Sequence, residues 1–355
     1  MALERIAYVL NVFPKVSETF IAGEIAEVLR RGVAVRVLVL RRSVEELRHG
    51  IVKRAGLDRY VSYGEAGFAE ELRRFRPQLI HAHFARRATE RARTLAAELA
   101  LPYSFTAHRY DIYSRPPEDF HERAMAAGAC ITVSEANADY IAETFAVPRG
   151  HIDIIPCGID TEHFAPGGEP AQPPHIVCVA RLEPVKNHSV LLAACALLRE
   201  RGVPFRCVLL GDGSAREGVA AEIERLALAD CVELHGAAEQ DEVRDWLGRA
   251  AVCALPSDSE GMPVSLMEAA ACGVPAVATA VGGVPELVQH SVTGLVVPPR
   301  QPAALADALA ALLGDPERRA EMGRAARRRA LERYSVRHQV DRLIEVWTRA
   351  IEVHP

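Results

Sequence analysis

The sequence has no apolar run long enough to cross a membrane. A spanning helix needs about 18 or more consecutive apolar residues, and the chain contains no such run. We also expect no secretory signal, because the acid Glu4 stands where a signal peptide needs a basic region. These absences predict a protein of the cytoplasm.

Cysteine pairs with metal or redox spacing are absent as well. None of the 8 cysteines forms a Cys-x-x-Cys pair, so a zinc ribbon or a thioredoxin-like redox site is excluded. Most cysteines, such as Cys178 and Cys207, lie in apolar runs and are expected to be small buried side chains. An excess of positive charge is lacking too, because the formal net charge is -5, which disfavours a nucleic-acid-binding domain.

The sequence does contain enough apolar material for two domains. Of its 355 residues, 49% are hydrophobic and 25% are charged, a composition typical of globular proteins. Short apolar runs alternate with longer amphipathic stretches, and this pattern starts again after a break near residue 165. The expected strands are Ile6–Val12, Val33–Leu40, Leu79–His83, Tyr103–Thr106, Cys130–Val133, Ile152–Ile155, Ile176–Ala180, Phe205–Leu210, Val232–Leu234, Ala251–Leu255 and Ala276–Thr279. The expected helices are Thr19–Arg31, Ala88–Leu99, Glu135–Thr144, His188–Arg201, Arg216–Leu226, Asp241–Arg249, Val264–Ala271, Pro302–Leu313, Pro316–Arg333 and Ser335–Ile351.

This alternation predicts an α/β fold with two Rossmann-like, doubly wound parallel sheets and a cleft between the domains. The segment 166–174 is rich in proline and glycine and is expected to be the linker. Residues 1–165 then form the first domain and residues 175–334 the second, while residues 335–355 form a helix that packs back on the first. Open α/β sheets bind ligands beyond the carboxyl ends of their strands, so the residues after each strand are the candidates for function.

The most informative segment is 257–268, which follows an expected strand and opens an expected helix. It reads Ser-Asp-Ser-Glu-Gly-Met-Pro-Val-Ser-Leu-Met-Glu. Gly261 lets the backbone approach a ligand closely, and Pro263 suits the first turn of a helix. Free N–H groups at a helix start bind anions such as a diphosphate. The residues expected to contact this ligand are Gly261, Met262, Pro263, Val264, Ser265 and Leu266.

Two carboxylates flank this turn. Glu260 precedes Gly261, and Glu268 lies inside the helix among apolar neighbours. A carboxylate repels a phosphate but accepts hydrogen bonds from sugar or ribose hydroxyls. We therefore expect both acids to bind hydroxyl groups. The alternative is that Glu260 is an ordinary loop acid and Glu268 a solvated acid on a helix.

Two cations share the loop after the first strand of the second domain. The planar fork of Arg181 and the point charge of Lys186 together suit a pyrophosphate. The alternative is a surface salt bridge to Glu183. Gly211 and Gly213 end the next strand in a tight turn that exposes the backbone to a ligand, although this motif is weak on its own and is not a Gly-x-Gly-x-x-Gly fingerprint.

The first domain offers histidines at the ends of two expected strands. His108 is expected to face the cleft, and the alternative is a packing role. His81 and His83 alternate like a pair of metal ligands, but no third ligand is evident. The loop 11–19 contacts an acceptor or phosphate in one interpretation, and only caps the following helix in the other.

These motifs resemble the retaining glycosyltransferases of family 4, which have the GT-B fold. The most specific element is the pair of acids separated by seven residues, Glu260 and Glu268. Arg181 and Lys186 match the diphosphate-binding pair of the family. His108 matches a cleft histidine that touches the donor sugar.

The resemblance covers nearly the whole chain. Residues 277–286 are similar to a further family signature, and residues 13–20 look like a subgroup that builds bacterial exopolysaccharide or lipopolysaccharide. The chain departs from many members after its first strand, where Pro14 to Ser17 replace a glycine-rich loop, and at Arg109, where many members have glycine. Both departures lie in the half expected to bind the acceptor.

The resemblance implies transfer of a hexose or similar sugar from a nucleoside diphosphate to a hydroxyl of a glycan or lipid-linked acceptor. It implies retention of configuration and neither a metal nor another cofactor. Glu260, His108, Arg181 and Lys186 would be the catalytic residues. Two alternatives stay open: a sugar-nucleotide epimerase on the same fold, and a module that binds sugar nucleotides without catalysis.

A locally basic stretch bears on localisation. Residues 41–59 contain six cations and three acids. The cations are Arg41, Arg42, Arg48, Lys53, Arg54 and Arg59, and the acids are Glu45, Glu46 and Asp58. Such a stretch attracts anionic headgroups, so peripheral association with the inner face of the cell membrane is one interpretation. A solvated helix and loop is the other. The basic run in 324–333 is expected to be a solvated helix face.

Overall fold

The computed structural model describes residues 2–15, 17–44 and 50–354. It divides into two compact units, of which the first comprises residues 1–158 with 336–355, and the second comprises residues 159–335. The chain therefore enters the second unit ahead of the segment 166–174 that was expected as the linker. Its last helix is part of the first unit. Arg48, Glu45 and Glu46 of the basic stretch, and Val16 of the loop 11–19, lie outside the described residues.

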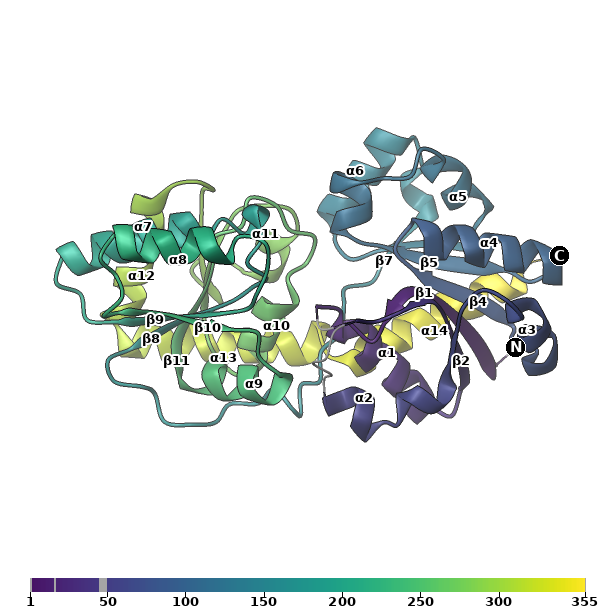
Figure 1. Cartoon of the computed structure of the whole chain (residues 1–355), viewed down its shortest axis with the longest axis horizontal. Coiled ribbons are helices and arrows are strands. Elements are labelled where there is room, and N and C mark those ends of the chain that lie inside the picture. Colours follow the sequence, from purple (N-terminus) through teal and green to yellow (C-terminus); the bar gives the residue numbers. More distant parts are fainter. Residues whose placement is uncertain (1, 16, 45–49, 355) are drawn as a thin grey trace. The chain divides into compact units, whose positions relative to one another are not determined.

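The first unit is built on a parallel sheet with the strand order β3-β2-β1-β4-β5-β6-β7 (Figure 1). Its strands are β1 (Arg5–Phe13), β2 (Ala34–Arg42), β3 (Val61–Tyr63), β4 (Leu79–His83), β5 (Tyr103–Ala107), β6 (Ala129–Thr132) and β7 (Ile152–Ile154). Its helices are α1 (Thr19–Arg30), α2 (Gly50–Arg54), α3 (Phe68–Phe75), α4 (Arg87–Leu99), α5 (Phe120–Ala126), α6 (Glu135–Phe145) and α14 (Val336–Glu352).

Alternate residues of the central strands face two separate cores. Tyr8 of β1 points into a core that α1 and α14 complete, and it contacts Trp347 of α14 with ring centroids 6.1 Å apart. Ala7 and Val9 of the same strand point to the opposite face, where α3, α4, α5 and α6 cover the sheet. This alternation follows from the two-residue period of a strand. Both faces are apolar because helices bury both of them.

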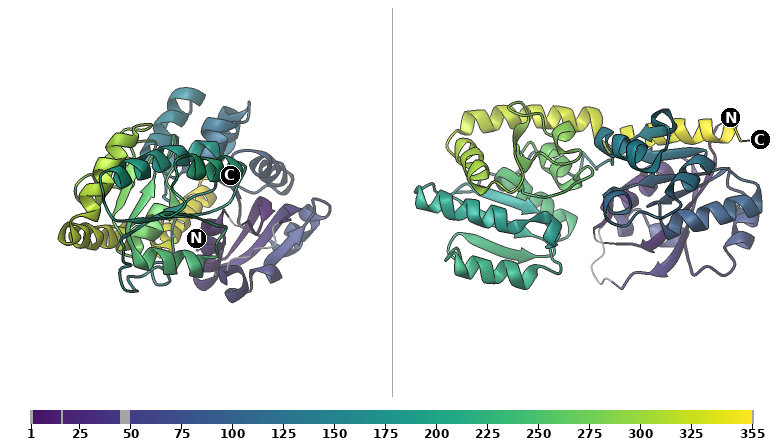
Figure 2. Two further views of the ribbon diagram at one scale, coloured as in Figure 1. Left: turned by 60° about the vertical axis from the view of Figure 1, so that its left-hand side comes forward. Right: turned by 90° about the horizontal axis from the view of Figure 1, so that it is seen from above.

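The second unit repeats this architecture with the strand order β10-β9-β8-β11-β12-β13, again parallel. Its strands are β8 (His175–Val179), β9 (Arg206–Leu210), β10 (Val232–Gly236), β11 (Ala250–Leu255), β12 (Ala276–Thr279) and β13 (Gly294–Val297). Its helices are α7 (His188–Glu200), α8 (Arg216–Arg225), α9 (Gln240–Arg249), α10 (Val264–Ala271), α11 (Val284–Leu287), α12 (Pro302–Leu313) and α13 (Pro316–Arg333). In the views of Figure 2, each unit is a sheet with helices on both sides.

The expected fold class of two doubly wound α/β domains is confirmed. The strands β3 (Val-Ser-Tyr) and β13 (Gly-Leu-Val-Val) were not predicted, although runs of the same length were predicted elsewhere in the chain. The expectation that the cysteines are buried is confirmed for all but Cys231, which is partly exposed. Among the described residues, no helix combines the length and apolar character that a membrane span requires.

The basic run of α13 is only partly solvated. The Nη1 atom of Arg327 donates to the carbonyl oxygens of Thr161, Phe164 and Ala271 at 2.9, 2.7 and 2.7 Å. Arg329 donates to two further carbonyl oxygens. A solvated face was therefore the wrong expectation for these two arginines, because their guanidinium groups satisfy the carbonyl oxygens of neighbouring segments.

Candidate functional site

The strand order of each sheet has one switch point, and a ligand site is expected at the carboxyl ends of the strands there. In the first sheet, successive strands are added outward on one side of β1 and then, from β4 onward, on its other side; in the second sheet the same switch occurs between β8 and β11. Loops that follow the two strands at such a switch point leave in opposite directions and open a crevice. In the second unit these are the loop after β8, which carries Arg181 and Lys186, and the loop after β11, which carries Glu260.

The two loops of the second unit are tied together by hydrogen bonds. The backbone N–H of Asp258 donates to the carbonyl oxygen of Val185 at 2.8 Å. The side-chain amide of Asn187 donates to Asp258 Oδ1 at 2.9 Å, and Lys186 Nζ lies 2.5 Å from Glu260 Oε1. The structure therefore brings Lys186 and Glu260, which are 74 residues apart in the sequence, into direct contact.

Glu260 is buried and has one satisfied oxygen. Its Oε1 accepts from Lys186 and also from the hydroxyl of Ser257 at 2.6 Å. The carbonyl oxygen of Ser257 in turn accepts from Thr279 at 2.5 Å. Among the described residues, Oε2 of Glu260 has no hydrogen-bond partner. This carboxylate is thus held in place through one oxygen while the other remains able to accept a hydroxyl.

Glycines allow the loops around Glu260 to touch. A Cβ atom on Gly282, whose φ is +50°, would lie 1.8 Å from the carbonyl oxygen of Glu260. The N–H of the next residue, Gly283, donates to the carbonyl oxygen of Gly261 at 2.9 Å. The backbone of residues 277–286 therefore packs directly against the turn at Glu260. This close packing is a structural reason for the glycines at positions 282 and 283.

Gly211 and Gly213 play a similar part beside Arg181. A Cβ atom on Gly211 would lie 1.9 Å from the carbonyl oxygen of Ala180, and one on Gly213 would lie 2.5 Å from that of Leu182. The N–H of Leu182 donates to the carbonyl oxygen of Asp212 at 3.0 Å. These glycines were predicted as ligand contacts, and the structure shows that their backbone packs against the loop that carries Arg181.

The start of α10 leaves fewer N–H groups free than the sequence predicted. The N–H of Leu266 donates to the carbonyl oxygen of Pro263 at 3.2 Å, so the expectation that it is free was wrong. This bond forms because the first turn of the helix tightens around Pro263. The N–H groups of Val264 and Ser265 have no partner among the described residues, and α10 has no side-chain cap. Met262 and Pro263 are buried beneath this turn.

Glu268 is only 6% exposed, and no hydrogen bond or ion pair reaches its side chain within the described part of the chain. Burial raises the pKa of its carboxyl group to about 8. The expected alternative of a solvated helix acid is therefore wrong. A buried carboxyl group without a partner destabilises the free protein, so the structure holds an acceptor group that a ligand with hydroxyl donors would satisfy.

Arg181 is exposed, and none of the described residues binds its side chain. The surface salt bridge to Glu183 that was considered for it does not form, because Glu183 accepts instead from the hydroxyl of Ser214 at 2.8 Å. From the sequence, no role was assigned to Asp258, Asn187 or Ser257. Nothing in the sequence near them indicates their partners, which come from the neighbouring loop.

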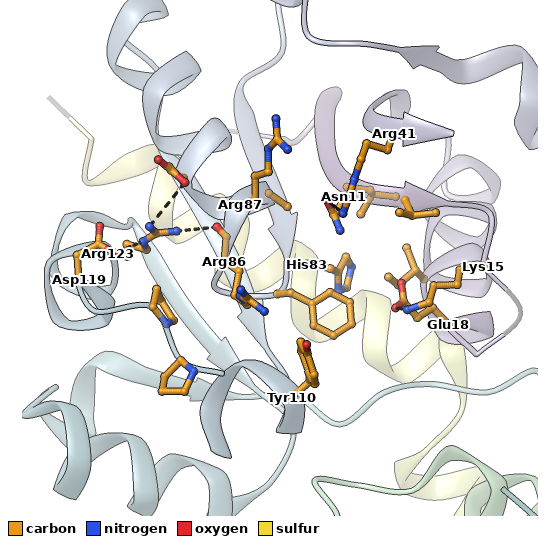
Figure 3. A pocket seen from close by; sticks show the side chains of 18 of the residues that line it. Asn11, Lys15, Glu18, Arg41, His83, Arg86, Arg87, Tyr110, Asp119 and Arg123 are labelled. Atoms are coloured by element: carbon orange, nitrogen blue, oxygen red, sulfur yellow. Dashed lines mark hydrogen bonds and ion pairs between the residues drawn. The ribbon is translucent and has the colours of Figure 1, made fainter. Parts of the chain in front are cut away.

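The first unit has a pocket of about 680 Å³ at its own switch point (Figure 3). Lys15 follows β1, Arg41 lies near the end of β2, Arg86 follows β4 and Tyr110 follows β5, so the lining comes from the carboxyl ends of neighbouring strands. Arg86 lies over the ring of Tyr110, with its guanidinium carbon 5.7 Å from the ring centroid. The lining mixes charges of both signs and is suited to a polar ligand.

Several charges of this pocket are already paired. Lys15 forms an ion pair with Glu18 at 2.6 Å, and Arg123 forms one with Asp119 at 2.7 Å. Arg41 donates to the side-chain oxygen of Asn11 at 3.3 Å. Among the described residues, no acid pairs with Arg41 or Arg86.

His108 does not line this pocket, but it contacts a residue that does. Its Nε2 lies 3.2 Å from Nδ1 of His83, whose ring is part of the pocket lining. His108 is packed between Phe20 and Phe84, with ring centroids 5.0 and 4.7 Å away. Burial, and then the neighbouring His83, lower the pKa of His108 well below its usual value. His108 is therefore a neutral imidazole.

Asp111 fixes the backbone on either side of this histidine pair. One carboxylate oxygen accepts from the N–H of His108 at 3.0 Å, and the other accepts from the N–H of Ala85 at 2.5 Å. Burial raises the pKa of Asp111 to about 7. Asp111 was not predicted as part of the site, although it lies three residues after His108.

Comparison with known proteins adds a family context. A family model described as Glycosyltransferase Family 4 matches residues 17–163, and one described as Glycosyl transferases group 1 matches residues 159–329. A protein assigned to colanic acid biosynthesis, the glycosyltransferase WcaL of Escherichia coli K12, is 41% identical over 172 residues. These are 46% of this chain and 42% of that protein. The chain spans about half the length of the curated relatives it matches.

Solved structures resemble the whole chain. A glycosyltransferase from Rickettsia africae superposes with a TM-score of 0.82 and 18% identity, over 99% of each chain. HepE of Anabaena, in complex with UDP and glucose, superposes with a TM-score of 0.80 and 18% identity, over 97% of this chain and 99% of that chain. These likenesses show the GT-B fold.

Proposed function

We propose that this chain, in which a Glycosyltransferase Family 4 region precedes a glycosyl transferases group 1 region on a GT-B fold, transfers a sugar from a nucleoside-diphosphate sugar. The acceptor is a hydroxyl of a glycan or a lipid-linked glycan, in the assembly of a surface polysaccharide. The observation that carries the proposal is the pair of acids on either side of the α10 start. Glu260 forms an ion pair with Lys186, and the side chain of Glu268 is buried without a partner among the described residues.

The donor diphosphate binds at the start of α10. The N–H groups of Val264 and Ser265 point their positive dipoles at the anion, and the unpaired guanidinium of Arg181 adds a fork of donors. Lys186 contributes a second positive charge. These groups stabilise the charge that grows on the departing diphosphate during transfer.

The two acids bind the hydroxyl-bearing ends of the donor. Glu268 accepts from the ribose hydroxyls, and the free Oε2 of Glu260 accepts from a hydroxyl of the transferring sugar. A carboxylate accepts two hydroxyl hydrogen bonds readily because it has no proton of its own. In this arrangement the neutral sugar and ribose of the donor contact the two acids, and its anionic diphosphate contacts the two cations.

Transfer proceeds with retention of configuration by attack on the same face of the sugar. The bond between the anomeric carbon and the diphosphate oxygen breaks while the bond to the acceptor oxygen forms, and the leaving diphosphate takes the acceptor proton. No protein nucleophile is needed for this step. The pocket of the first unit binds the polar acceptor, and a lipid-linked acceptor would bring the protein to the inner face of the membrane.

Catalysis requires no metal ion under this proposal, because two cations and a helix start already counter the diphosphate. Activity is therefore expected to persist in excess EDTA. A complete loss of activity that Mg²⁺ or Mn²⁺ restores would contradict this expectation.

The donor is identified by screening UDP-, GDP- and ADP-sugars for a rise in melting temperature, followed by a transfer assay with glycan acceptors. We expect one nucleotide class to stabilise the protein and its sugar to appear in a glycoside of unchanged anomeric configuration. Interconversion of donor sugars without an acceptor would instead indicate an epimerase. Binding without turnover across acceptors would indicate a non-catalytic module.

A further inference from the structure

A buried chain of hydrogen bonds links four elements of the first unit to His108. Glu24 of α1 is 0% exposed, and its Oε1 accepts from the hydroxyl of Tyr8 at 3.0 Å. The same oxygen lies 3.2 Å from Nε2 of His83, whose Nδ1 faces Nε2 of His108. The other oxygen accepts from the side-chain amide of Gln339, on α14, at 2.8 Å.

Glu24, His81 and His83 are grouped like metal ligands, but their side chains already have hydrogen-bond partners. Ligand atoms of Glu24, His81 and His83 lie within 4.8 Å of one another. However, the ring nitrogens of His81 lie 2.8 Å from the hydroxyl of Ser104 and 3.3 Å from that of Thr106. Both oxygens of Glu24 are occupied as well. A metal would have to displace these bonds, so the cluster is a hydrogen-bond network.

The hydrogen bond between Gly158 and Gln339 fixes which groups around Glu24 donate and which accept. The side-chain oxygen of Gln339 accepts from the N–H of Gly158 at 2.8 Å, so its amide nitrogen faces Glu24. Three donors then meet the carboxyl group of Glu24, which fits its ionised form, an acceptor only. Burial and the charge of Glu24 raise the pKa of Tyr8 well above its usual value, so this hydroxyl stays a donor.

The proton of His83 is placed by the same logic. Because Glu24 only accepts, a neutral His83 carries its proton on Nε2, and its Nδ1 becomes an acceptor. His108 must then donate from Nε2, which leaves its Nδ1 unprotonated. This nitrogen has no partner among the described residues, so it can accept a hydrogen bond from a ligand.

We propose that Glu24 is a positioning residue that acts through His83 to fix the tautomer of His108, so that His108 presents an accepting Nδ1 to a hydroxyl of a bound sugar. The proposal rests on the proposed function for its ligand. The hydrogen-bond chain itself does not depend on that function.

The test uses the full-length protein labelled with ¹⁵N-histidine, and the signal of His108 is assigned with His108→Asn. In the wild-type protein we expect His108 to be protonated on Nε2 only, and a proton on Nδ1 would overturn the proposal. In Glu24→Gln, the carbonyl oxygen of the new amide should face Gln339 and its nitrogen should face His83. That arrangement reverses both tautomers and moves the proton of His108 to Nδ1.

Kinetics give a second readout. Glu24→Gln should lower kcat by about tenfold or more, because a donor replaces the acceptor that the sugar hydroxyl needs, whereas affinity for the nucleoside diphosphate should change less than about twofold. Tyr8→Phe is the matched control, because it removes another bond to the same oxygen and leaves the link to His83. It should keep the wild-type tautomer and kcat.

The outcomes separate this proposal from the proposed function. If no sugar transfer is found, the tautomer of His108 in the wild-type protein still tests the hydrogen-bond chain. If transfer is found and Glu24→Gln keeps both the wild-type tautomer and kcat, the positioning role is wrong while the transfer activity stands. The wild-type spectrum requires no substitution, so a variant that fails to fold does not remove the test.

Discussion

At the scale of single residues, Glu268 makes the stability of the protein depend on pH. Burial raises the pKa of its carboxyl group from 4.5 to about 8. An acid with a raised pKa contributes stability that is fully present below pH 4.5, the value for the unfolded chain, and that is lost as the pH rises toward 8. The free protein therefore carries a destabilising carboxylate at neutral to alkaline pH, and a ligand that donates hydroxyl bonds would offset it.

We predict that Glu268→Gln stabilises the free protein and weakens nucleotide binding. Because an amide has no charge to bury, its stabilising effect should be larger at pH 8 than at pH 5, by about 2 kcal/mol in the free energy of unfolding. Urea unfolding at both pH values, with calorimetry of nucleoside-diphosphate binding, measures the two effects. Glu260→Gln is the matched control, and it should lower kcat while keeping nucleotide affinity. A reversed pattern would mean that the roles of the two acids are exchanged.

The two cations of the site differ in what they contact, so their variants should differ. Arg181→Ala should leave stability within about 0.5 kcal/mol, because an exposed and unpaired side chain contributes little, yet lower diphosphate affinity by about tenfold. Lys186→Ala should lower both, since it leaves the buried Glu260 without its cation. Adding Glu260→Gln to Lys186→Ala should restore stability but not binding. Thermal melts and nucleotide titrations of the three variants provide the test, and equal stability losses for both single variants would contradict it.

At the scale of the elements, the site depends on loops that approach one another more closely than any side chain permits. Gly211 brings the turn after β9 against the loop after β8 with a φ of +147°. Across this contact, the N–H of Ala180 donates to Leu210 at 3.0 Å, and that of Ala215 donates to Leu182 at 2.7 Å. The orientation of Arg181 is thus set by backbone hydrogen bonds between two strand ends.

We expect Gly211→Ala to disturb the position of Arg181. The added Cβ atom would meet the carbonyl oxygen of Ala180 at 1.9 Å, so the loop must move, and we expect a stability loss of about 2 kcal/mol with a drop in diphosphate affinity. Gly218→Ala is the matched control, because nothing lies within 4 Å of its added atom and it lies in helix α8. It should be neutral or stabilising. Wild-type nucleotide affinity in Gly211→Ala would show that the contact does not position Arg181.

At the scale of the whole molecule, each unit contains one of the two tryptophans. Trp347 lies on α14 and is 0% exposed in the core of the first unit, whereas Trp246 lies on α9 of the second unit. The last segment of the chain thus completes the core of the unit formed by its beginning. The two indoles can report separately on the two units.

We predict that Trp347→Ala destabilises the first unit by about 3–5 kcal/mol, as large-to-small substitutions in a core do. The second unit should still bind the nucleoside diphosphate, because its candidate site is formed by residues 159–335 alone. Trp246 fluorescence during urea unfolding, together with nucleotide titration, tests both parts. Loss of nucleotide binding in Trp347→Ala under conditions where Trp246 stays native would show that the site needs the first unit.

Local sequence indicated most of the elements and the position of the candidate site. Apolar runs of three to eight residues predicted the central strands, because strands buried on both faces need continuous apolar sequence. Parallel strands end at one edge, so the residues after them could be named in advance, and Arg181, Lys186 and Glu260 do lie on neighbouring loops. The strand β3 was not predicted, because its sequence, Val-Ser-Tyr, is not a continuous apolar run.

Only the tertiary structure determined the partners and the burial of the charged groups. The contact between Lys186 and Glu260, the lack of a partner at Glu268 and the chain from Glu24 to His108 all join residues that are remote in sequence or surrounded by distant elements. Sequence can place an acid on a helix, but its pKa depends on the solvent and partners that packing removes or supplies. For the same reason, the sequence predicted a histidine at a strand end, and only the fold determined which groups face its ring nitrogens.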